Sequence, residues 1–213
     1  MPNIPDMTEL LGLGAVFTVL FVTLGPLKML GPIAQLAHDI DESMLRKVAF
    51  NAFAIALVAV VIGGFAGQVL LQNWNVPIAD MELAGGIIFL LVGLRVVLEQ
   101  YQPAHAAAAP LPPSPLGAAM RIAFPLIVTP YGIAALIVLL ANSHDASRTT
   151  SILLILVGVM ILNLLALLFV RRIMAGVTLI ALQILGAVLG VLQVALAVEM
   201  ILRGLQRLGV LRV

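Results

Sequence analysis

The sequence predicts an all-α membrane protein of six transmembrane helices, built as two inverted three-helix repeats with broken first and fourth helices. Three observations predict this fold. Hydrophobic residues make up 62% of the 213 residues and charged residues only 10%, against about 25% charged residues in a soluble domain. Apolar segments of near membrane-spanning length follow one another along the whole chain. A proline-rich connection divides them into three and three.

The apolar segments are long enough for membrane helices, because a bilayer core about 30 Å thick requires roughly 20 residues per helix. Strands that cross a membrane alternate in polarity, and these segments do not. With a mean hydropathy of +1.19, the chain has too few polar residues to cover a water-facing surface. We expect helices at about 7–24, 48–71, 81–98, 117–140, 151–170 and 177–202, the first continuing with an interruption to 37.

The connection at 100–117 separates the two halves. It holds five prolines and a run of four alanines, and proline blocks helix continuation because it lacks a backbone N–H. We therefore expect a first three-helix repeat at 1–99, a linker at 100–117 and a second three-helix repeat at 118–213. An odd number of helices per half inverts the second half relative to the first, as in many transporters.

Orientation follows from the lysines and arginines near the membrane, which are enriched on the cytoplasmic side. With both termini outside the cytoplasm, the inside segments hold six of these residues and the outside segments four. The balance favours this orientation in the cell inner membrane. The inside set is Arg46, Lys47, Arg95, Arg121, Arg171 and Arg172; the outside set is Arg148, Arg203, Arg207 and Arg212.

Two helices are interrupted at corresponding places. The first break spans 25–32 (GPLKMLGP) and the second spans 124–132 (FPLIVTPYG). Proline and glycine free backbone groups, and such groups persist at membrane depth only where they line a cavity or pack inside protein. Interrupted helices in the two halves are typical of a transporter's midplane binding site. The alternative is a simple kink in each helix, since both residue types are common in membrane helices.

Polar side chains in and beside the breaks are the candidates for binding. Lys28 has two interpretations: it holds a substrate carboxylate, or it extends to the headgroups from a break near the membrane surface. Asn163, in the middle of the fifth helix, either faces the site or forms an interhelical hydrogen bond. The half-helix N-termini would offer N–H groups to an anionic group of a substrate. The predicted substrate-binding residues are Gly25, Pro26, Lys28, Gly31, Pro32, Thr129, Pro130, Tyr131, Gly132 and Asn163.

Four stretches resemble the MarC family of inner-membrane proteins. They are 21–26 (FVTLGP), 84–94 (AGGIIFLLVGL), the second break with FPL at 124–126 and TPYG at 129–132, and 197–205 (AVEMILRGL). Their order and spacing carry the resemblance, which spans essentially the whole chain. The resemblance implies six helices in inverted repeats. It also implies relatives that transport small neutral amino acids such as glycine and alanine.

The breaks depart from the family pattern. Members typically have an asparagine or aspartate before the first proline and Gly-Asn shortly after it, whereas this chain has Gly25 before Pro26 and Lys28-Met29 after it. The usual Gly-Pro-Gly of the second half is Thr129-Pro130-Tyr131 here. The resemblance therefore implies the fold, and it leaves the substrate open.

These observations favour a secondary transporter or exporter of a small neutral solute, working by alternating access around the two breaks. The alternative is an accessory or assembly subunit that transports nothing. We expect no enzymatic activity, because the sequence has no HExxH or GxSxG motif. We expect no cofactor and no metal site, and without a basic stripe no nucleic-acid partner. The expected partners are the bilayer and a small-molecule substrate; coupling to H⁺ or Na⁺ and a homo-oligomeric state stay open.

Overall fold

The described part of the chain is helical throughout. The computed structural model describes residues 12–27, 29–30, 33, 40–99, 114–143, 145–176 and 179–211. Within these ranges there are helices and no strand, which confirms the all-α prediction. In chain order they are α2 (Leu13–Leu24), α4 (Glu42–Asn73), α5 (Ile78–Glu99), α6 (Pro115–Arg121), the π-helix η1 (Ile122–Ile127), α7 (Pro130–Ala141), α8 (Ala146–Leu168), α9 (Val170–Gly176) and α10 (Leu179–Arg207).

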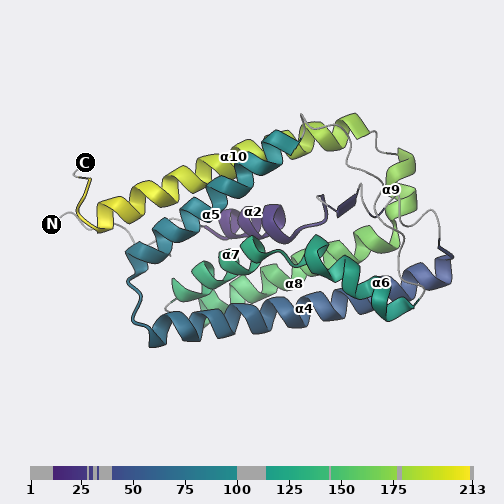
Figure 1. Ribbon diagram of the computed structural model, residues 1–213, viewed down its shortest axis with the longest axis horizontal. Helices are drawn as coiled ribbons and strands as arrows, with labels where there is room; N and C mark the ends of the chain where they lie inside the picture. The colour runs from purple at the N-terminus through teal and green to yellow at the C-terminus, as the bar shows by residue number, and fades with distance from the viewer. Residues whose placement is uncertain are drawn as a thin grey trace.

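The long helices run side by side along one axis (Figure 1). The closest pair is α5 with α10, which pack along their lengths; α4 packs against α6 and α7, and α2 packs against α8. Each of these pairings joins a helix of the predicted first half to a helix of the second half. The two halves are therefore interleaved and share one core.

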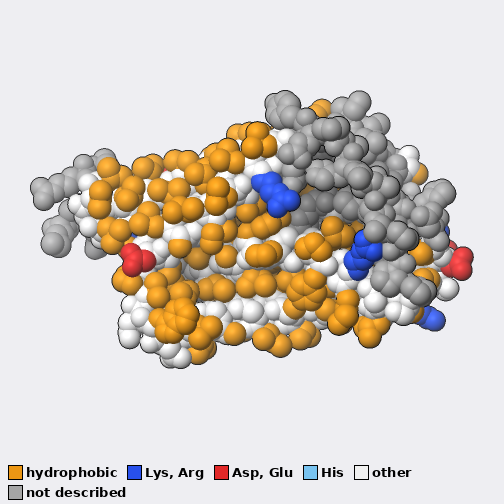
Figure 2. Space-filling view, in the orientation of Figure 1, with side chains coloured by type: hydrophobic (Ala, Val, Ile, Leu, Met, Phe, Trp, Pro, Cys, Tyr) orange, Lys and Arg blue, Asp and Glu red, His pale blue; other side chains and the backbone are white. Residues whose placement is uncertain are grey.

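The outer surface of this bundle is apolar. Figure 2 shows hydrophobic side chains spread over the visible face of the long helices, with few charges between them. Large exposed side chains such as Ile62, Leu91 and Leu154 are 62%, 64% and 68% exposed. A surface of this kind is suited to lipid, because contiguous apolar patches of this extent are rare on soluble monomers.

Two described helices are long and apolar enough to cross a membrane on their own. These are α4, with 32 residues, and α8, with 23 residues. The segment from Pro115 to Ile127 and the helix from Pro130 to Ala141 give a third span if they are taken together, bent by 62° at the break between them. The structure thus supports two to three spans, and six spans remain a prediction.

Several predicted helix boundaries differ from the structure: α4 begins at Glu42 instead of 48, and α10 ends at Arg207 instead of 202. The linker prediction ends at 117, but α6 begins at Pro115, because the Ser114 hydroxyl caps it by accepting a hydrogen bond from the Gly117 N–H at 3.1 Å. Residues 100–113 lie outside the described part of the chain. The fifth helix begins at Ala146 instead of 151. Hydroxyls in its first turns, such as that of Thr150, bond to the carbonyl four residues earlier, so polar residues continue the helix.

Glycines bring α5 and α10 into backbone contact. A Cβ atom added to Gly86 would lie 3.0 Å from both the Ala197 carbonyl oxygen and the Ile201 nitrogen, and 2.7 Å from Ile201 Cγ1. One added to Gly93 would lie 2.8 Å from a side-chain carbon of Val194 and 3.1 Å from its nitrogen. Small residues allow this close approach of membrane helices, where van der Waals packing drives association.

Gly86→Ala is therefore expected to destabilise the fold by about 1–3 kcal/mol, because the new methyl group meets backbone that has no room to yield. Thermal unfolding of the purified protein in detergent measures the loss. Gly158→Ala is the matched control, because nothing lies within 4 Å of a Cβ at Gly158 and alanine is the better helix former by about 1 kcal/mol. Equal destabilisation by the two substitutions would contradict the close crossing.

Candidate functional site

The first break follows α2 directly. Gly25 has an extended backbone (φ −78°, ψ 174°), and its N–H still donates to the Phe21 carbonyl at 2.9 Å. The next residue, Pro26, has no N–H to continue the helix. A Cβ at Gly25 would lie only 2.1 Å from the Phe21 oxygen, so this turn admits only glycine. Both Gly25 and Pro26 are buried.

The second break lies between η1 and α7. Phe124 is non-helical (φ −121°, ψ 123°) and a cis peptide bond joins it to Pro125. Helical geometry resumes after Thr129, whose extended backbone and side chain form the N-cap of α7. The Thr129 hydroxyl oxygen accepts a hydrogen bond from the Gly132 N–H at 3.2 Å, and Pro130 occupies the first helical position, which favours proline.

The two breaks meet in the core. The hydroxyl of Thr129 donates to the Thr23 carbonyl at 3.2 Å, and the amide Nδ2 of Asn163 donates to the Leu24 carbonyl at 2.7 Å. In a continuous helix these carbonyls would accept from residues 27 and 28. Side chains from the second half of the chain thus satisfy the carbonyls at the end of α2.

Close packing accompanies these hydrogen bonds. Gly132, in the first turn of α7, lies so near α2 that a Cβ there would fall 2.2 Å from Leu24 Cδ2. Thr23, Leu24 and Gly132 are all buried. We call the contact formed by Thr23, Leu24, Thr129, Gly132 and Asn163 the break junction.

The junction contains an acceptor with no partner. Asn163 is 1% exposed, and its Oδ1 accepts no hydrogen bond from the described residues. A buried unpaired acceptor costs about 1–3 kcal/mol and calls for an explanation. The side-chain amide of Gln193, at the α5–α10 contact, also has only one of its two polar atoms paired. Its Nε2 donates to the Phe89 carbonyl, and its Oε1 accepts no hydrogen bond from the described residues. Only Asn163 lies where both helix breaks meet.

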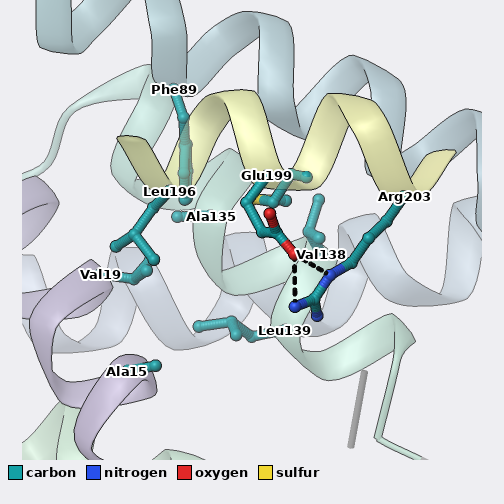
Figure 3. Close-up of a pocket in the computed structure, with 10 residues that line it drawn as sticks. Ala15, Val19, Phe89, Ala135, Val138, Leu139, Leu196, Glu199 and Arg203 are labelled. Atoms are coloured by element: carbon teal, nitrogen blue, oxygen red, sulfur yellow. Dashed lines mark hydrogen bonds and ion pairs between the residues drawn. The ribbon is translucent and has the colours of Figure 1, made fainter. Parts of the chain in front are cut away.

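A cavity of about 150 Å³ lies between α2, α5, α7 and α10, and none of the five junction residues lines it. Its walls are apolar, with Val19, Phe89 and Ala135 among them, as Figure 3 shows. The ion pair between Glu199 and Arg203, at 2.7 Å, is the charged part of the lining. The spacing of four residues on α10 favours this pair, but nothing in the sequence indicates the cavity.

Most of the predicted site residues that the structure describes come together. Gly25, Pro26, Thr129, Gly132 and Asn163 are buried at or next to the junction. In the first turn of α7, Pro130 is exposed and Tyr131 is half-buried. The predictions for Lys28, Gly31 and Pro32 lie outside the described residues.

Sequence reasoning missed two polar contacts. It overlooked Thr23, whose carbonyl joins the two breaks. It also gave no indication of the contact of Glu82, which is fully buried and whose Oε2 lies 3.2 Å from Nε of Arg207. Each contact joins segments far apart in the chain, so no local pattern reveals it.

Comparison with known families identifies the chain as an integral membrane protein. The sequence model described as "MarC family integral membrane protein" matches residues 11–208. The chain belongs to the MarC family. No solved structure matches it.

The relatives are distant. The inner membrane protein MarC of Salmonella typhimurium is 26% identical over 100 residues, and so is that of Salmonella typhi. These matches cover 47% of this chain and 44% of each Salmonella protein, so the chain matches less than half of their length. A membrane protein of Methanocaldococcus jannaschii is 24% identical over 195 residues, which cover 89% of this chain and 94% of the relative.

Removing the Thr129 hydroxyl is expected to weaken the junction. Thr129→Val keeps the shape and loses the hydrogen bonds to the Thr23 carbonyl and the Gly132 N–H. We expect a loss of about 1–3 kcal/mol, because buried polar groups lose a partner. Thr129→Ser keeps the hydroxyl and is expected to retain most of the stability in the same detergent unfolding measurement. A valine variant as stable as the serine variant would show that the hydroxyl does not hold the breaks together.

Proposed function

We propose that this MarC family protein is a secondary transporter of a small neutral solute in the inner membrane. The observation that carries the proposal is the break junction, where two interrupted helices meet around a buried, unpaired amide oxygen. Transporters bind their substrates where discontinuous helices meet near the bilayer midplane. Two unrelated kinks would have no reason to meet at one point.

The chemistry of the junction suits a zwitterion. Oδ1 of Asn163 is an acceptor for a solute ammonium group, since its Nδ2 is already fixed on the Leu24 carbonyl. The positive end of the α7 dipole lies at Thr129 and Pro130, in the same region, which favours a carboxylate. Glycine and alanine are the first solutes to test, because family resemblance and size both favour them.

The helix pairings support an inverted repeat and alternating access. In an inverted repeat α2 corresponds to α7, α4 to α8 and α5 to α10. Under this correspondence the α2–α8 pairing is equivalent to the α7–α4 pairing, and the α5–α10 pairing is equivalent to itself. In the proposed mechanism one repeat rocks against the other. The hydrogen bonds from Thr129 and Asn163 to the end of α2 close the site on one side, and they part when it opens. Measuring solute flux under an imposed H⁺ gradient and under an imposed Na⁺ gradient identifies the ion that drives the cycle.

The charges fit an orientation with the C-terminus outside the cytoplasm. Arg46, Lys47, Arg171 and Arg172 lie on the start of α4 and on α9, at the end of the bundle opposite the C-terminal end of α10 (Figure 1). Basic residues are enriched on the cytoplasmic side. A topology reporter fused after Val213 tests whether the C-terminus lies outside the cytoplasm.

Proteoliposomes of the purified protein are expected to take up radiolabelled glycine or alanine with saturable kinetics. Asn163→Leu is expected to lower the flux at low substrate concentration about tenfold, because one buried hydrogen bond to a charged group contributes about 1.5 kcal/mol. The matched control is Gln193→Leu, which removes a similarly buried and half-paired amide away from the junction. It is expected to change stability as much and flux much less.

Equal loss of flux in the two leucine variants would assign the effect to general destabilisation and remove Asn163 from the site. No flux of any small neutral solute, with a folded protein and either gradient, would contradict the transporter and favour an accessory subunit.

A further inference from the structure

The cavity of Figure 3 has one charged edge on walls that are otherwise apolar. Val19, Phe89 and Ala135 are buried wall residues. Glu199 and Arg203 form the charged edge, and their side chains are 54% and 20% exposed. The charged edge is therefore the part of the lining that lies nearest the surface.

The ion pair at this edge leaves polar atoms available to a ligand. Nε and Nη2 of Arg203 both contact the same carboxylate oxygen of Glu199, Oε1, at 2.8 and 2.7 Å. The guanidinium has further N–H donors, and the carboxylate has a second acceptor oxygen. Nη1 of Arg203 and Oε2 of Glu199 have no polar partner among the described residues. A ligand can therefore bind a donor and an acceptor here while the pair stays intact.

The charges of the edge favour a zwitterion. The positive charge of Arg203 is cancelled by Glu199, and the other described lining residues are uncharged, so the cavity is neutral overall. A solute with a single charge would add an unbalanced charge beside apolar walls, which is costly. A zwitterion adds no net charge, and each of its charged groups finds a group of opposite charge in the pair.

The walls favour a small aliphatic side chain on this zwitterion. A dry apolar cavity of about 150 Å³ is large enough to hold benzene, so a methyl or isopropyl group fits. The described lining has no polar side chain besides Glu199 and Arg203. A hydroxyl group on the solute would therefore lose its hydrogen bonds to water without a replacement at the walls.

The cavity lies next to the break junction along two helices. Val19 lies four residues before Thr23 on α2, which is about 6 Å along the helix axis. Ala135 lies three residues after Gly132 on α7, about 4.5 Å along that axis. The cavity thus begins about one helical turn from the junction, on the side where α2 begins and α7 ends.

We propose that this cavity is a second binding site for the solute, and that it selects an amino acid with a small aliphatic side chain, such as valine. Oε2 of Glu199 accepts from the ammonium group, Arg203 donates to the carboxylate, and the apolar walls surround the side chain. The inference rests on the proposed function for the choice of a zwitterionic solute, but binding at the cavity can be measured without transport.

The test is equilibrium dialysis of radiolabelled valine against the purified full-length protein in detergent. Affinity is expected to rise from glycine to alanine to valine by about fourfold per added carbon. Threonine has the shape of valine and is expected to bind about tenfold more weakly because of its hydroxyl group. Isovalerate, which is valine without the ammonium group, and isobutylamine, which lacks the carboxylate, should each compete about tenfold less well.

Variants of the cavity identify where the solute binds. Arg203→Gln and Glu199→Gln are each expected to weaken valine binding about tenfold, because one contact to a charged group is lost. The matched control is Arg46→Gln, which breaks an ion pair of the same spacing with Glu42 on α4 and should leave binding unchanged. Ala135→Leu fills the cavity, keeps the charged pair and is expected to abolish binding. Thermal unfolding checks that each variant is folded.

Asn163→Leu separates this site from the break junction. Valine binding that survives Asn163→Leu and is lost in Arg203→Gln supports the cavity site, whether or not the protein shows flux. Three results would overturn the inference: no valine binding by the wild-type protein, unchanged binding in folded Arg203→Gln and Ala135→Leu variants, or equal affinity for valine and threonine. Flux that persists with any of these results would leave the proposed transporter in place without the second site.

Discussion

The interruption of a helix inside a membrane core creates the constraint on which the rest of this structure depends. Where α2 ends at Gly25 and Pro26, the carbonyls of Thr23 and Leu24 lose the N–H groups that a continuous helix would supply. Water is absent at such a depth, and each unpaired group costs several kcal/mol. The Thr129 hydroxyl and the Asn163 amide donate to them instead. The end of α2 therefore depends on side chains of the second half of the chain for its hydrogen-bond donors.

This dependence explains the interleaved packing of the helices. The donors to the end of α2 come from the second half of the chain, so α2 must lie against α7 and α8. The helix α4 packs against α6 and α7, and α5 packs against α10, where Gly86 and Gly93 allow the backbones to approach closely. Irregular backbone thus occupies the middle of the bundle, while regular helices surround it and present an apolar surface to lipid.

The sequence predicts the features that depend on local chemistry. Proline inside an apolar segment cannot donate the backbone hydrogen bond that continues a helix, so both breaks could be placed from Pro26, Pro125 and Pro130. The composition alone indicates that the outer surface of the protein faces lipid, and this inference requires no knowledge of contacts within the fold. Contacts between distant segments could not be predicted, because they depend on how the helices pack. Examples are the hydrogen bond from Thr129 to the Thr23 carbonyl and the contact of the buried Glu82 with Arg207. Polar residues at the start of α8 also misled the boundary prediction, because their hydroxyls bond within the helix.

The central claim, that the two breaks meet in the folded protein, is tested most directly by disulfide trapping. The chain has no cysteine, so Leu24→Cys with Gly132→Cys gives a clean pair, and the contact between these positions suits a Cβ–Cβ distance of about 3.5–4.5 Å. Mild oxidation in membranes, followed by mass spectrometry of the peptides, should show the 24–132 crosslink in high yield. The pair Leu24→Cys with Gly158→Cys should give none, because no atom of another helix lies within 4 Å of a Cβ at position 158. Absence of the 24–132 crosslink in a folded protein, or equal crosslinking of the control pair, would contradict the account.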